Sequence, residues 1–210
     1  MIDRVVLCLL AYLAGSFPTG VVLGSLKGVD VRKIGSGNIG ATNVTRALGS
    51  RFGLYTLAGD LLKGFIPVLI AIWLWPSWMF VSLVGLLCVL GHCFSIFLDF
   101  EGGKGVATSA GVFLALAPFA TLVAAAVWGL VVFSTRVSSF GAFAALPTLL
   151  LCMFLPSFNF AGIAIASPIH FLPLAVAIAI VVLFRHKSNL RRMMEGAESR
   201  FQKSDENAAK

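Results

Sequence analysis

Long apolar runs alternate with short polar segments along most of the chain. Several of the runs reach the roughly 20 residues that a membrane-spanning helix needs. The apolar runs are Val5–Leu26, Phe52–Trp75, Trp78–Leu98, Val106–Thr135, Phe140–Leu155 and Ile169–Phe184. Proline interrupts the first run at Pro18 and the fourth at Pro118. This pattern predicts an all-α polytopic membrane protein, because helices satisfy their own backbone hydrogen bonds in lipid.

The composition supports a lipid environment. The chain has 210 residues, of which 59% are hydrophobic and 12% are charged, and its mean hydropathy is +0.96. A soluble core of this size could not bury so much hydrocarbon. We expect one integral membrane domain over residues 1–198 and a polar cytoplasmic tail over residues 199–210. The four cysteines lie in apolar runs without CxxC spacing, so neither a disulfide framework nor a metal site is expected.

The positive charges predict how the chain is oriented. Of its sixteen Lys and Arg residues, five lie in Lys27–Arg51 and seven follow Phe184. The connections around Pro76 and over Pro156–Pro168 carry none. Because cytoplasmic loops are rich in Lys and Arg, the N-terminus is predicted outside and the C-terminus in the cytoplasm. The net charge of +7 therefore indicates membrane topology, and no nucleic-acid partner is expected.

The same rule predicts a break in the run Val106–Thr135. Its two flanks, Asp99–Gly105 and Arg136–Ser139, are both assigned to the cytoplasm, so the run must cross an even number of times. Two short helices meeting near Pro118 satisfy this requirement. The expected total is seven helical segments, including this short hairpin, and all polar motifs then share one face.

The segment from Ile34 to Arg46 is small, polar and rich in glycine. Its hydroxyl and amide side chains are those of Ser36, Asn38, Thr42, Asn43 and Thr45. Glycine lets the backbone approach a ligand closely, and exposed N–H groups beside an arginine favour phosphate binding. The alternative is a flexible connector between two spans.

A second glycine-rich segment surrounds Lys104 in Phe100–Gly105 and opens onto an apolar run. In physical terms it is a candidate phosphate cradle, although the order of residues does not match a nucleotide-binding P-loop. The alternative is a lysine whose ammonium extends to the membrane surface from a mainly buried side chain.

Ionisable residues inside or at the ends of the apolar runs are further candidates. Asp60 and Lys63 lie three residues apart inside a span, either as a functional pair or as an ion pair that fixes helix packing. His186 and Asn189 share a face if the last helix continues, and His186 is a candidate proton acceptor. His92 near the cytoplasmic end of its run is another candidate, whereas His170 falls near the outer face.

Together these motifs resemble the bacterial acyl-phosphate:glycerol-3-phosphate acyltransferases, the PlsY family. The resemblance covers essentially residues 1–200. It rests on Gly35-Ser36-Gly37-Asn38-Ile39-Gly40-Ala41-Thr42-Asn43 with Arg46, on Gly91-His92 with Glu101-Gly102-Gly103-Lys104-Gly105, and on Arg185-His186 with Asn189, Arg192, Gly196 and Glu198. Asp60-x-x-Lys63-Gly64 also matches.

The resemblance implies transfer of a fatty acyl group from acyl phosphate to the 1-hydroxyl of glycerol 3-phosphate in the bacterial inner membrane. It implies a site on the cytoplasmic face, with no cofactor, metal, coenzyme A or acyl carrier protein. The implied catalytic residues are Ser36, Arg46, Lys104, His186 and Asn189. The implied substrate-binding residues are Gly37, Asn38, Thr42, Asn43, Lys63, His92, Gly102, Gly103, Gly105, Ser138 and Ser139. Asp60 and Glu198 are expected to be structural.

Two other function classes fit parts of the pattern. A transporter for an organic phosphate would need cations and broken helices, with polar loops available to both faces. A membrane scaffold with a cationic tail would bind anionic lipid. The uncharged outer loops argue against the transporter, and the scaffold leaves the glycine-rich segments unexplained.

Overall fold

Each apolar run of the sequence is helical in the computed structural model, which describes residues 2–156, 158–160, 163–165 and 167–201. The α-helices are α1 (Ile2–Ser16), α2 (Thr19–Ser25), α3 (Ala41–Leu48), α4 (Ser50–Leu74), α5 (Trp78–Cys93), α6 (Val106–Leu116), α7 (Pro118–Thr135), α8 (Ser138–Cys152), α9 (Leu172–Arg185) and α10 (Lys187–Met194). Short 3-10 turns are η1 (Val31–Lys33), η2 (Ile96–Leu98) and η3 (Ile169–Phe171). Large side chains such as Leu130 and Phe133 are mainly exposed, as a lipid-facing surface requires.

Helix length and composition identify the elements that could cross a membrane. Three helical segments of the described residues are long and apolar enough: α4, α5 with its extension to Leu98, and α7. Two bent pairs raise the number to five, α1 with α2 at 47° and η3–α9 with α10 at 56°. The apolar helices α6 and α8 are shorter. The seven segments predicted from the sequence are thus all helical, while the number of crossings and the side of each end stay predictions.

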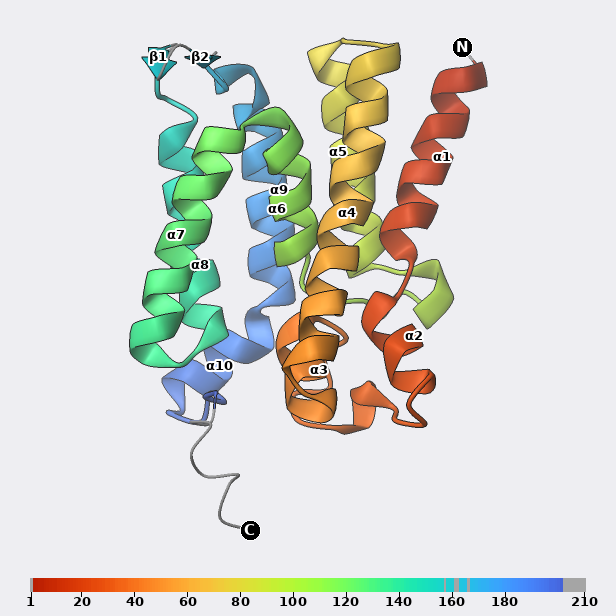
Figure 1. The fold of residues 1–210 in the computed structure, drawn as a ribbon, viewed down its shortest axis with the longest axis vertical. Helices are drawn as coiled ribbons and strands as arrows, with labels where there is room; N and C mark the ends of the chain where they lie inside the picture. Colours follow the sequence, from red (N-terminus) through yellow and green to blue (C-terminus); the bar gives the residue numbers. More distant parts are fainter. Residues whose placement is uncertain (1, 157, 161–162, 166, 202–210) are drawn as a thin grey trace.

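The helices pack closely where glycine removes a side chain. A Cβ added at Gly15 of α1 would overlap the backbone of Cys88 in α5, and one at Gly91 would overlap that of Tyr12. Gly64 of α4 faces Thr108 of α6 in the same way. The pair α7 and α8 lies to the side of this group, with α6 between them and α4 in the view of Figure 1.

The predicted break near Pro118 is confirmed. Helix α6 ends at Leu116, and α7 begins at Pro118, where the missing N–H of proline costs nothing in the first turn. The chain reverses at this break, so both ends of the hairpin point toward the end of the molecule that carries α2, α3 and α10 (Figure 1). The polar segments that flank the hairpin therefore approach one end of the fold.

Two segments expected to be loops contain regular structure. Within Lys27–Arg51, η1 begins after Asp30, whose carboxylate accepts the Arg32 N–H, and α3 follows with Val44 fully buried. No run of apolar residues signals α3, because only one side of this short helix contacts the protein. Within Pro156–Pro168, strands β1 (Phe158–Phe160) and β2 (Ile163–Ile165) form an antiparallel pair in the register Asn159↔Ala164. Residues 157, 161, 162 and 166 lie outside the described residues.

Candidate active site

A cavity of about 860 Å³ opens among α3, α4, α6, α7, α8 and α9. It brings together residues that the sequence analysis selected from positions 36 to 198. The selected residues that line it are Ser36, Asn38, Thr42, Asn43, Arg46, Asp60, His92, Lys104, Gly105, Ser138, Ser139, His186, Asn189 and Glu198. The selected residues Gly37, Lys63, Gly102 and Gly103 do not line it.

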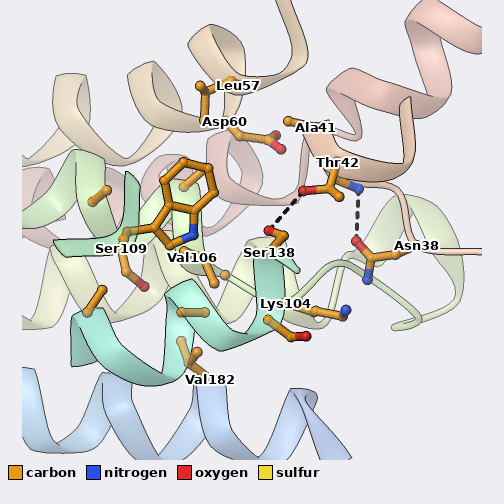
Figure 2. Close-up of a pocket in the computed structure, with 18 of the residues that line it drawn as sticks. Asn38, Ala41, Thr42, Leu57, Asp60, Lys104, Val106, Ser109, Ser138 and Val182 are labelled. Carbon is orange, nitrogen blue, oxygen red and sulfur yellow. Dashed lines mark hydrogen bonds between the residues drawn. The ribbon is translucent and has the colours of Figure 1, made fainter. Parts of the chain in front are cut away.

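The cavity has a polar end and an apolar end. Lys104, Ser138 and Asn38 lie near one another at the polar end, and Leu57 and Val106 belong to the walls that lead away from it (Figure 2). The apolar walls come from α4, α6, α7, α8 and α9 and include Leu57, Leu61, Phe113, Ala124, Trp128, Leu146, Leu149 and Val182. Such a cavity suits a ligand with an anionic head and a hydrocarbon tail.

The first glycine-rich segment is organised by Asn43 from the first turn of α3. Its buried side chain accepts a hydrogen bond from the Ser36 N–H at 2.9 Å and donates one to the Val31 carbonyl at 2.8 Å. The Asn38 side chain accepts the Gly40 N–H at 2.9 Å, immediately before α3 begins. The N–H groups at the start of α3 thus face the cavity beside Ser36, where an anion would be stabilised.

Lys104 follows a loop that is fixed mainly by backbone contacts. The Gly102 N–H donates to the Cys93 carbonyl at 3.2 Å, and the Gly103 N–H donates to the His92 carbonyl at 2.9 Å. These two amides are therefore already occupied, and the phosphate cradle expected from them is not open in this structure. The N–H groups that remain free to bind a phosphate are those at the start of α6, next to Lys104.

The Lys104 ammonium is a half-buried cation in this cavity. Burial lowers the pKa of Lys104 to about 8, and the positive charges of Arg192, Arg46 and Arg185 act in the same direction, against the carboxylate of Glu198. Within the described residues it makes no hydrogen bond or ion pair. A cation left without a protein partner in a cavity is available for an anionic ligand.

Glu198 holds three side chains at the polar end. Its carboxylate accepts from Ser139 at 2.8 Å, Asn189 at 2.5 Å and Arg192 at 2.9 Å. Burial raises the pKa of Glu198, but these hydrogen bonds outweigh that effect and leave its pKa below the ordinary value. The side-chain amide oxygen of Asn189, Oδ1, is by contrast buried with no partner in the described structure. It is free to accept a hydrogen bond from a hydroxyl group of a ligand.

His186 lies at the 56° bend between α9 and α10, so the last helix continues past it only after a change of direction. Its Nδ1 is 2.8 Å from the Val182 carbonyl. Since a carbonyl can only accept, Nδ1 carries the proton and Nε2 of the neutral ring keeps its lone pair. The bend thus gives His186 a hydrogen-bond acceptor at the cavity wall.

Known proteins resemble the whole chain. A model of the family described as glycerol-3-phosphate acyltransferase matches residues 5–196. The glycerol-3-phosphate acyltransferase of Trichlorobacter lovleyi is 49% identical over 91% of this chain and 94% of its own length. That of Geobacter sulfurreducens is 43% identical over 96% of this chain and 99% of its own length. The chain belongs to the glycerol-3-phosphate acyltransferase family.

Two crystal structures of one member of the family share this fold. The structures are of PlsY (YgiH), an integral membrane glycerol 3-phosphate acyltransferase. Its glycerol 3-phosphate form is 40% identical, with a TM-score of 0.87 over 99% of this chain and 100% of that one. Its lysophosphatidic acid form is 40% identical, with a TM-score of 0.84 over 95% and 96%. The resemblance read from the motifs is thereby confirmed at the level of the family and its integral membrane fold.

In the present structure, Asp60 and Lys63 form an ion pair with an Nζ–Oδ1 distance of 2.8 Å. The Lys63 ammonium also donates to the Phe17 carbonyl at 2.8 Å, where α1 breaks before Pro18. His92 Nδ1 lies 3.8 Å from the Asp60 carboxylate. Lys63 thus fixes helix packing, while Asp60 and His92 reach the cavity wall, so both readings of the pair retain support.

Arg185 was part of the third motif but had no role in the sequence analysis. Its guanidinium donates to the Gly103 carbonyl at 3.0 Å and to the Gly102 carbonyl at 2.6 Å, and it stacks over Phe94. It therefore ties the loop before Lys104 to the end of α9. The only indication of this role in the sequence was the position of Arg185 directly before His186, at the end of an apolar run.

The hydroxyls of Ser138 and Ser139 both have protein partners. The Thr42 hydroxyl donates to Ser138 at 3.1 Å across the cavity (Figure 2), and Ser139 donates to Glu198. Both serines begin α8, whose first N–H groups, like those of α3 and α6, border the polar end. Three helix N-termini and two cations therefore surround the same space.

Proposed function

We propose that the protein transfers a fatty acyl group from acyl phosphate to the 1-hydroxyl of glycerol 3-phosphate, giving 1-acylglycerol 3-phosphate and inorganic phosphate. Membership of the family supports the acceptor. The observation that carries the proposal is the shape and charge of the cavity, with Arg46, Lys104 and three helix N-termini at one end and apolar walls at the other. Both substrates carry phosphate, and one carries a hydrocarbon chain.

Glycerol 3-phosphate binds at Lys104 in this proposal. The ammonium and the free N–H groups at the start of α6 hold its phosphate, since a helix N-terminus and a nearby cation both favour an anion. Gly102, Gly103 and Gly105 shape the loop that presents Lys104. The side-chain amide oxygen of Asn189 then accepts the hydrogen of the neighbouring 2-hydroxyl, which turns the 1-hydroxyl toward the acyl carbon and leaves the 1-hydroxyl proton for its acceptor in the chemical step.

Acyl phosphate binds between Arg46 and the apolar walls. Its phosphate lies at the guanidinium of Arg46 and at the start of α3, with Ser36 as a further donor. Its chain lies along the apolar walls of the cavity, which include residues of α4 and α7. Arg46 offsets the negative charge that grows on the phosphate as it leaves, which is the part of the reaction where a fixed cation lowers the barrier most.

The chemical step needs one nucleophilic attack and one proton transfer. The hydroxyl oxygen bonds to the acyl carbon, the bond from that carbon to the phosphate oxygen breaks, and inorganic phosphate departs. The hydroxyl proton passes either to Nε2 of His186 or to an oxygen of the leaving phosphate. Because acyl phosphate is a mixed anhydride with a good leaving group, the step proceeds without a covalent enzyme intermediate, coenzyme A or acyl carrier protein.

Reconstitution tests the proposed function. The purified protein in lipid nanodiscs should release inorganic phosphate and form 1-acylglycerol 3-phosphate in equal amounts, only when acyl phosphate and glycerol 3-phosphate are both present. Arg46→Ala and His186→Ala should stay folded and lose turnover. Product formed from acyl coenzyme A but not from acyl phosphate would refute the donor, and full phosphate release by Arg46→Ala would refute the role of Arg46.

We further propose that the polar end faces the cytoplasm of a bacterial cell, as the positive charges favour. The exposed turn at Arg136 between α7 and α8 reports on this side. In cells, Arg136→Cys, in a chain whose four native cysteines are replaced, should react with a membrane-permeant thiol reagent and not with an impermeant one. Labelling by the impermeant reagent would contradict the predicted orientation and place the polar end outside the cytoplasm.

A further inference from the structure

A short segment after α10 lies along the polar end of the cavity. The match ends at residue 196, and we call residues 197–201 the C-terminal strap. It leaves α10 through Gly196, which has a φ of 67°, and the Ala197 N–H donates to the Arg192 carbonyl at 2.7 Å. At its other end the Phe201 N–H donates to the Arg136 carbonyl at 2.8 Å. The strap was assigned in part to a solvated tail, but it is fixed at both ends.

Arg46 is held by this strap. Its Nη2 donates to the Ser199 carbonyl at 3.2 Å, and its guanidinium carbon lies 5.5 Å from the centroid of the Phe201 ring. Within the described residues Arg46 has no carboxylate partner. The remaining N–H groups of the guanidinium are therefore free for a ligand.

A long side chain needs such support to act as a fixed cation. Arg46 comes from the last turn of α3 and is only half buried, so α3 alone leaves its torsions free. An aromatic ring favours a cation over its face, and a planar guanidinium stacked there has a defined orientation. The Ser199 carbonyl fixes one edge of the same plane.

We propose that Phe201, together with the Ser199 carbonyl, is a positioning residue that orients the Arg46 guanidinium toward the phosphate of the acyl donor. The inference rests on the role given to Arg46 under the proposed function. Phe201 also lines the cavity, and in this account it acts on the phosphate through the Arg46 guanidinium. A strap that only covers the cavity would need bulk at position 201, whereas a strap that orients Arg46 needs an aromatic face.

Substitutions at position 201 in the full-length protein separate these two roles. In nanodiscs, Phe201→Leu keeps apolar bulk without the ring and should lower kcat about 3- to 10-fold, with the KM for glycerol 3-phosphate changed less than about twofold. Phe201→Tyr keeps the ring and should retain the kcat of the unmodified protein. The matched control is Phe133→Leu, which removes an exposed ring 5.6 Å from Arg136 and should leave kcat unchanged. Equal thermal midpoints for all variants would show that folding is intact.

A double substitution tests whether the effect passes through Arg46. In an Arg46→Lys background, which lacks the planar guanidinium, Phe201→Leu should lower kcat less than about twofold. The inference is overturned if Phe201→Leu matches the unmodified protein, if Phe201→Tyr is as impaired as Phe201→Leu, or if the loss persists in the Arg46→Lys background. With Arg46→Ala inactive, any of these results defeats the positioning role alone. Full activity of Arg46→Ala would defeat both this inference and the role of Arg46 in the proposed function.

Discussion

The two glycine-rich loops that border the cavity are held in different ways. The loop before α3, residues 34–40, depends on side chains, because Asn43 bridges the Ser36 N–H and the Val31 carbonyl. The loop before α6, residues 99–105, is held by backbone contacts to Cys93 and His92 on its amide side and by the Arg185 guanidinium on its carbonyl side. Each loop leads to a helix N-terminus and to one cation. The difference indicates that the second loop tolerates change less than the first.

The two cations differ in whether the protein contacts the charged group. Lys104 lies within its loop and has no protein partner among the described residues, so its ammonium is available for a phosphate. Arg46 lies beyond its loop, and its guanidinium depends on Ser199 and Phe201. The proposed reaction has two anionic substrates, and two cations from different loops offer one binding position for each.

Among residues that are not assigned a direct contact with substrate, the largest effect is expected where the second loop meets α5. A Cβ at Gly102 would overlap the backbone carbonyl of His92, which cannot rotate away. Gly102→Ala should lower activity by about 100-fold, because small displacements of catalytic groups have effects of that size, and should destabilise the fold by about 1–3 kcal/mol. Phosphate release and thermal unfolding measure the two effects. Gly28→Ala is the control for activity, because a Cβ there meets nothing within 4 Å and lies away from the cavity, although its left-handed φ of 68° costs some stability. Equal activity of both variants would show that the second loop is not rigid.

Removing the charge of Glu198 should have the next largest effect. Glu198→Gln weakens the hydrogen bonds to Arg192 and to Asn189, and the proposed function assigns the side-chain amide oxygen of Asn189 to orienting the acceptor substrate, so kcat should fall about tenfold. Steady-state phosphate release in nanodiscs gives kcat directly. The matched control is Glu195→Gln, which breaks an exposed pair with Arg191 and should change kcat less than about twofold. Similar decreases in kcat for both variants would show that Glu198 has no specific role at the cavity.

The pH dependence of activity tests the cation of the second loop. Burial lowers the pKa of Lys104 to about 8. Below that pH the ammonium is protonated and binds phosphate, and above it the charge is lost, so kcat/KM for glycerol 3-phosphate should fall as pH rises, by up to about tenfold per pH unit. Lys104→Arg keeps its charge and should lack this alkaline decline. An unchanged decline in that variant would assign it to another group.

The smallest effect is expected in the first loop. Asn43→Ala leaves the Ser36 N–H and the Val31 carbonyl without their partner, so the fold should lose about 1–3 kcal/mol and activity about 3- to 5-fold. Asn43→Asp keeps the acceptor for Ser36 but not the donor, and its buried carboxylate would face the Val31 carbonyl, so it should lose at least as much. Thermal unfolding and phosphate release follow both variants. A loss of activity in Asn43→Ala as large as that of Gly102→Ala would contradict the difference between the loops.

The helices could be predicted from the sequence because apolar runs of that length have few other solutions in lipid. The break at Pro118 followed from positive charges that place both flanks of one run on the same side. Helix α3 could not be predicted in the same way. It begins after Gly40 without a side-chain cap, and its apolar residues Ala41, Val44 and Leu48 have helical spacing but are too few in one short polar segment to identify a helix.

The candidate site was predictable in its residues but not in its contacts. The motifs named Lys104, Arg46 and His186, because glycine, cations and histidine in polar segments are chemically conspicuous. The occupied amides of Gly102 and Gly103 depend on a backbone path that residue types do not specify. The hold of Phe201 on Arg46 joins residues far apart in the chain, and no local pattern encodes such a pairing.

The most direct test of the account compares the two cations as neutral variants, Lys104→Gln and Arg46→Gln, with each substrate varied in turn. We predict that Lys104→Gln raises the KM for glycerol 3-phosphate at least about tenfold and leaves the KM for acyl phosphate nearly unchanged, since one lost charged hydrogen bond has this magnitude. Arg46→Gln should instead lower kcat and raise the KM for acyl phosphate alone. If both variants raise both KM values equally, or if Lys104→Gln leaves the KM for glycerol 3-phosphate unchanged, the two cations do not serve separate phosphates.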